Sequence, residues 1–140
     1  MTMKTYLALA LLVTVLAGNA YGEGEVYYCA ETDKNGFWFD EALKKYKPSL
    51  FTEKKFKIKF DSTAKTVEIK GYPDDISKNG TYNCRASLRK TYPQQLSCHA
   101  KFSSLNFNSN TGRFVLFSGY AYFNVDGDSI SSSYGTCEKF

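Results

Sequence analysis

Two runs of strand-forming residues around a turn dipeptide constrain the fold of this chain most. The first run extends from Arg113 to Val125 and the second from Asp128 to Cys137. Asp126-Gly127 between them is typical of a tight hairpin turn. Small or apolar residues occupy the odd positions of the first run, which predicts that this face is buried and that Gly119 marks a bend. These odd positions are Val115, Phe117, Gly119, Ala121, Phe123 and Val125.

The same period of two recurs along the chain and predicts an all-β fold. Lys54–Phe60 places apolar residues on one face and lysines on the other, and Thr66–Lys70 repeats the alternation after a turn. Further strands are expected at Val26–Ala30, Tyr82–Leu88 and Leu96–Phe102. About seven or eight short strands joined by tight turns predict a small antiparallel meander that closes into a barrel, with a two-sheet sandwich as the alternative.

One segment predicts a short helix within this all-β fold. Asp40 suits a helix N-cap, the lysines that follow suit the carboxyl end, and Pro48 suits the stop. The aromatic cluster Phe37-Trp38-Phe39 precedes this helix and is expected in the core.

The N-terminal residues predict export. Lys4 precedes an apolar run from Leu7 to Ala17, which is shorter than a bilayer span, and small residues follow it. Residues 1–22 are therefore predicted to be a signal peptide and residues 23–140 a single soluble domain, periplasmic or secreted. No further apolar segment suggests a membrane span.

Four cysteines follow the predicted signal peptide, and an even number in an exported chain indicates two disulfide bonds. Cys84 and Cys98 lie opposite each other if the hairpin between them is centred near Thr91. By elimination Cys29 pairs with Cys137, which joins the first strand to the last, as barrel closure predicts. Two other pairings remain open.

The register of the last strand conflicts with this pairing. A strict two-residue turn at Asp126-Gly127 places Ile130 on the core face and Cys137 on the other face. A bulge at Gly135 would restore the register; otherwise the bridge lies outside the barrel.

The titratable residues form no catalytic or metal-binding pattern. His99 is the only histidine and is expected on the outer face of its strand, with no activated nucleophile beside it. Asp40-Glu41 and Asp74-Asp75 are explained by capping and by a turn. Asp126-Gly127-Asp128 lacks the further ligands of a calcium loop, and no closely spaced zinc ligands occur. We expect a non-catalytic protein without a metal or cofactor.

Mild charge and exposed aromatic residues favour a binding role. The formal net charge is +4, to which Lys4 contributes, and this is far from a nucleic-acid footprint. The expected partner is a protein or envelope component. The expected surface lies around Tyr120, Tyr122 and the lysines of the strand pattern, Lys55, Lys57 and Lys59. Transport of a small apolar ligand inside the barrel is an alternative.

Two resemblances accompany this interpretation. The cysteine frame, together with Tyr27, Gly36-Phe37 and the terminal segment Gly135–Phe140, resembles small exported bacterial proteins of unknown function, which implies no activity. Ser118-Gly119-x-x-Tyr122, with Tyr27-x-Cys29, is similar to the c-type lysozyme inhibitor family of periplasmic β-barrels. In that family a Ser-Gly-x-x-Tyr segment and a later lysine enter the lysozyme cleft. The resemblance implies this role for Ser118 and Tyr122, although the later Lys-Gly is absent.

Overall fold

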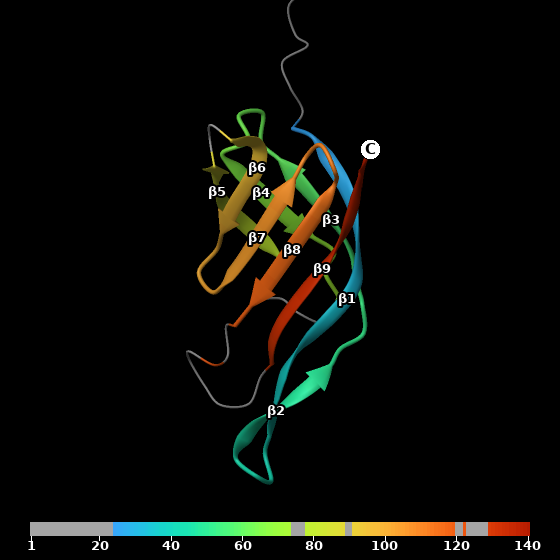
Figure 1. Cartoon of the computed structure of the whole chain (residues 1–140), viewed down its shortest axis with the longest axis vertical. Helices are drawn as coiled ribbons and strands as arrows, with labels where there is room; N and C mark the ends of the chain where they lie inside the picture. The colour runs from blue at the N-terminus through green and yellow to red at the C-terminus, as the bar shows by residue number, and fades with distance from the viewer. Residues whose placement is uncertain (1–23, 74–77, 89–90, 120–121, 123–128) are drawn as a thin grey trace, which may run out of the picture.

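The computed structural model describes residues 24–73, 78–88, 91–119, 122 and 129–140. The predicted signal peptide, Tyr120 and the Asp126-Gly127 turn lie outside these ranges. Within them, nine strands form one antiparallel sheet, and eight of these close into a barrel because β1 pairs with β9 (Figure 1). The predicted all-β barrel is confirmed. The strands are β1 (Val26–Asp40), β2 (Lys45–Leu50), β3 (Lys55–Phe60), β4 (Thr66–Lys70), β5 (Gly80–Leu88), β6 (Tyr92–His99), β7 (Ser103–Asn108), β8 (Arg113–Ser118) and β9 (Ile130–Lys139).

Strand β1 takes part in three pairings because it is long. Its residues 26–30 pair with β3, residues 27–37 pair with β9, and residues 35–40 pair with β2. In the described part of the chain β2 pairs with β1 alone. Figure 1 shows β2 and the end of β1 projecting together beyond the barrel. We call residues 35–50 the arm.

The interior of the barrel is packed with rings. Tyr27 lies edge-on to Phe107 with centroids 5.0 Å apart, and Phe56 lies edge-on to Phe114 at 5.3 Å. Full burial of such a side chain contributes about 1.5–3 kcal/mol, so these residues are the main source of stability. The core contains Tyr27, Cys29, Phe56, Ile58, Phe60, Val67, Ile69, Tyr72, Tyr82, Cys98, Leu105, Phe107, Phe114, Leu116 and Cys137.

Both predicted disulfide bonds are present. Cys29 faces Cys137 across the β1–β9 ladder, and Cys84 faces Cys98 across the β5–β6 hairpin. The first bridge therefore joins the two strands that close the barrel. Disulfide bonds of this kind form in oxidising compartments. Within the described ranges, no helix has the length and apolar character that a membrane crossing requires.

The helix predicted at Asp40–Pro48 is wrong, because this segment is a turn followed by β2. The Asp40 carboxylate accepts a hydrogen bond from the Leu43 N–H at 3.0 Å, as an N-cap would, but the chain then reverses at Lys44, whose φ is 50°. Cross-strand pairing of Phe39 with Tyr46 replaces the second helical turn. A two-turn helix is marginal alone, so the long partner strand β1 decides the conformation.

The buried face of β8 is the opposite of the predicted one. Phe114, Leu116 and Ser118 face inward, whereas Val115 and Phe117 are 46% and 40% exposed. The prediction assumed one continuous strand through Gly119, but β8 ends at Ser118. Without that continuation, the alternation of β8 follows from its pairing with β7 and β9.

The bulge predicted at Gly135 occurs on the facing strand instead. Strand β9 alternates without interruption, and Cys137 points inward. Strand β1 carries the irregularity between Glu31 and Asp33, opposite Gly135 and Tyr134. A Cβ atom on Gly135 would clash with the Ala30 carbonyl oxygen, so glycine permits this close approach.

Candidate binding surface

The arm exposes aromatic side chains on both of its faces. Phe37 is 45% exposed and lies opposite Pro48, and Trp38 is 52% exposed and lies opposite Lys47. Neighbouring residues on a strand point to opposite faces, so the two rings project in opposite directions. They were expected in the core, and only Phe39 of this cluster is buried.

Tyr122, one of the predicted binding residues, packs against the arm. Its ring lies 5.5 Å from that of Tyr46 in β2, which in turn lies 5.2 Å from that of Phe39. Tyr122 remains 60% exposed. A row of three rings thus extends from the buried Phe39 to an exposed end. Tyr120 lies outside the described residues.

Ion pairs hold the exposed end of the arm. Lys47 Nζ lies 2.6 Å from Asp40 Oδ2, and Lys44 Nζ lies 2.9 Å from Glu41 Oε2. The hydrogen bond from Lys47 and the N–H of Leu43 hold the pKa of Asp40 below its usual value. Exposed pairs of this kind contribute little stability.

The predicted lysine residues Lys55, Lys57 and Lys59 lie on the outer face of β3, as the alternation predicts. Lys57 lies directly opposite Lys70 of β4, a like-charge pair, and its Nζ lies 5.2 Å from the centre of the Tyr28 ring. Like charges in facing positions destabilise a sheet. We call Lys55, Lys57 and Lys59 the lysine face.

The arm and the lysine face are separate surfaces. Strand β3 pairs with residues 26–30 of β1, whereas β2 pairs with residues 35–40. The single surface predicted from Tyr122 and the lysines is therefore divided between the two halves of β1 (Figure 1).

Ser118, the serine of the Ser-Gly-x-x-Tyr segment, is 3% exposed and faces the barrel interior. A side chain in this position is not available to enter the cleft of another protein. Of the residues that this resemblance implies, Tyr122 is the one that is exposed.

A polar network inside the barrel escaped the sequence patterns. The Tyr72 hydroxyl donates to Glu31 Oε1 at 2.6 Å and accepts from Lys78 Nζ at 3.2 Å. Lys78 Nζ also donates to Ser131 Oγ at 3.0 Å, and Glu31 Oε2 accepts the N–H of Lys54 at 2.8 Å. These contacts satisfy charges that would otherwise be expensive to bury. The sequence feature that could have indicated a polar interior is the series of small polar residues on the inner face of β9, which includes Ser131 and Ser133.

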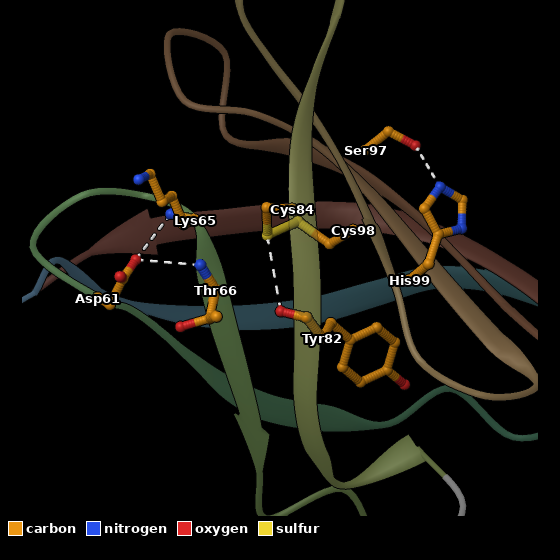
Figure 2. The surroundings of a disulfide bond; sticks show 8 residues. All are labelled: Asp61, Lys65, Thr66, Tyr82, Cys84, Ser97, Cys98 and His99. Carbon is orange, nitrogen blue, oxygen red and sulfur yellow. Dashed lines mark hydrogen bonds between the residues drawn. A yellow bond between two sulfur atoms is a disulfide. The ribbon is translucent and has the colours of Figure 1, made fainter.

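Ser97 and His99 form the contact closest to a catalytic pair. Figure 2 shows Ser97 Oγ and His99 Nε2, 3.0 Å apart, beside the Cys84–Cys98 bridge. Both side chains stand on β6, two residues apart, and His99 is exposed as predicted. In the described part of the chain no carboxylate contacts His99, so the third group that orients a catalytic histidine is missing there.

Metal-ligand geometry is also missing from the described residues, which contain no group of three or more His, Cys, Asp or Glu side chains arranged to hold an ion.

A buried phenol connects the two ends of the domain. Tyr27 donates to Glu25 Oε2 at 2.7 Å, and Lys139 Nζ bonds the other oxygen of Glu25. The hydrogen bonds from Lys139 and Tyr27 lower the pKa of Glu25. Burial, and then the bond to Glu25, raises the pKa of Tyr27 to about 12 from 10.0.

Alkaline stability should therefore depend on Tyr27. The folded state retains the phenol proton above pH 10, where the unfolded chain loses it, so stability falls as pH rises from about 10 to about 12. We expect Tyr27→Phe to weaken this dependence in urea unfolding between about pH 10 and about pH 12. The control Tyr28→Phe removes an exposed phenol and should leave the dependence unchanged. An unchanged slope in Tyr27→Phe would contradict the assignment.

Comparisons of the chain with protein-family models, curated proteins and solved structures find no match.

Proposed function

We propose that this protein is an exported, disulfide-bonded binding protein without catalytic activity, and that the arm is its main contact with a protein or envelope partner. One observation carries the proposal. The barrel closes without β2, yet β1 continues beyond the barrel and forms an arm with β2, on which Phe37 and Trp38 are exposed. Tryptophan and other aromatic residues are the usual anchors of protein interfaces. An isolated two-stranded ribbon is only marginally stable, so contact with a partner would stabilise the arm.

The lysine face contributes charge to this proposal. Lys55, Lys57 and Lys59 project from one strand, and Glu68, which lies opposite Lys59, is ion-paired with Lys70 at 3.1 Å. This arrangement favours a partner with an acidic surface and predicts association that weakens as salt increases.

The alternative of an apolar ligand inside the barrel gains no support from the interior. Aromatic rings in mutual contact occupy the space between the described strands.

A capture experiment tests the role of the arm. Immobilised protein is incubated with an envelope extract, and the component held by wild type is identified by mass spectrometry and then purified. We expect Trp38→Ala to weaken its binding about 30-fold, the effect of truncating an interface anchor. Phe117→Ala serves as the matched control, because Phe117 is exposed to a similar degree but lies on the barrel wall.

The outcomes of this experiment are distinct. Equal binding by wild type and Trp38→Ala would reject the arm as the contact. Loss of binding in Lys55→Gln/Lys57→Gln/Lys59→Gln with retention in Trp38→Ala would move the contact to the lysine face. Circular dichroism of each variant verifies that the barrel is intact.

A further inference from the structure

The outer wall of the barrel carries a groove that the proposed function does not use. It has a volume of about 720 Å³ and is lined by residues of β6, β7, β8 and β9, with Thr32 at the β1 bulge. This volume falls in the range of about 300–1,000 Å³ typical of small-molecule sites. Figure 1 shows β7, β8 and β9 side by side in this wall.

The register places the lining side chains in two rows. Asn106, Val115 and Tyr134 face one another across β7, β8 and β9, and Arg113 faces Thr136 in the next row. Tyr134 is 52% exposed and Val115 46% exposed. The bulge at Thr32 is adjacent to Tyr134, and bulges bend a strand and increase its twist. Thr32, at the irregularity opposite Gly135 and Tyr134, lines one side of the hollow.

The lining of the groove combines apolar side chains with polar ones. Leucine, valine and phenylalanine residues lie beside amides, threonine hydroxyls, an exposed phenol ring and the Arg113 guanidinium, and the lining contains no carboxylate and no lysine. Within the described residues, the side-chain amide of Asn106 and the guanidinium of Arg113 make no hydrogen bond to protein. These groups are oriented by the sheet and available to a ligand.

We propose that this groove binds an oligosaccharide. Sugars present many hydroxyls, which match amides and threonine hydroxyls, and apolar C–H faces, which match an exposed aromatic ring. Arg113 favours a sugar that carries a carboxylate, because a guanidinium binds carboxylates in a bidentate manner. A bound peptide strand is disfavoured, because β7 and β8 are paired on both sides and offer no free backbone edge.

Sugar titrations followed by amide NMR test this proposal. Chitotriose supplies a neutral probe and trigalacturonate an acidic one, and a glycan array extends the panel. We expect millimolar or tighter binding to at least one array sugar, with shifts confined to the Asn106, Val115 and Tyr134 amides and their neighbours. Tyr134→Ala should weaken binding at least tenfold, and Arg113→Gln should weaken trigalacturonate binding more than chitotriose binding.

Phe117→Ala is the control here too, because it lies on the outer face of β8 outside the groove. Trp38→Ala should also bind sugar normally, so the proposal for the groove and the proposal for the arm can be rejected independently of each other. Absence of binding across the array, or shifts that map to another surface, would overturn the proposal. A concentration-dependent pattern of shifts without sugar would identify the groove as a contact between two copies of the chain and would also overturn it.

Discussion

Replacing Cys29 and Cys137 with alanine should lower the free energy of unfolding by about 5 kcal/mol. The bridge joins residues that are 108 positions apart. In the unfolded chain, a cross-link removes more conformational entropy the longer the loop that it closes. Single domains are stable by about 5–15 kcal/mol in total, so this variant should be close to unfolding at physiological temperature. Urea denaturation followed by circular dichroism gives the value.

The second bridge is the internal comparison. Cys84 and Cys98 are separated by 14 residues, and their replacement with alanine should cost about 3 kcal/mol. Both pairs lie directly opposite each other in antiparallel ladders, so the loop length is the main difference between them. Should the shorter bridge prove the more stabilising, chain entropy would not explain their contributions.

Leu116→Ala should lower stability by about 2–5 kcal/mol, whereas Val115→Ala should change it by about 0.5 kcal/mol or less. Leu116 is fully buried between β7 and β9, and its truncation leaves a cavity in a core that is packed with rings. Val115 is half exposed on the outer face of the same strand. Thermal and urea unfolding of the two variants give a direct comparison.

This pair of variants also tests which face of β8 is buried. The odd-face pattern seen in the sequence makes the opposite prediction, in which Val115→Ala is the damaging change. The m-value should remain constant in both variants, because neither changes the surface that unfolding exposes. A larger effect at Val115 would show that β8 is displaced by one residue relative to its neighbours.

The arm illustrates where reasoning from local sequence reaches its limit. Residues 40–48 contain a good N-cap, lysines in favourable positions and a terminal proline, and all of these signals concern a helix in isolation. The Asp40 carboxylate does bind an N–H as an N-cap would, but it closes a turn. The pairing of β2 with β1 outweighs these small preferences. The exposed positions of Phe37 and Trp38 follow from that pairing and could not be recognised from composition, since aromatic clusters usually indicate a core.

The groove and the interior network depend on the register of neighbouring strands. Asn106, Val115 and Tyr134 are separated in the chain and become neighbours through two successive pairings. Glu31, Tyr72 and Lys78 likewise come from a bulged strand and from the segments on either side of residues 74–77, and they meet inside the barrel. No local motif marks either set, because each one includes residues that are far apart in the sequence, as Glu31 is from Tyr72.

What the sequence determined by itself is the part of the structure that follows from periodicity and covalent chemistry. Alternating polar and apolar residues produce strands whose inner faces must be buried, and four cysteines allow two disulfide bonds, one of which can join the ends of a barrel. The tertiary structure alone decided which face of β8 turns inward, which residues of β1 extend beyond the barrel and where its wall is hollow. A shift of one residue between strands exchanges the two faces of a sheet, and the free energy that selects one register comes from the whole set of neighbouring strands.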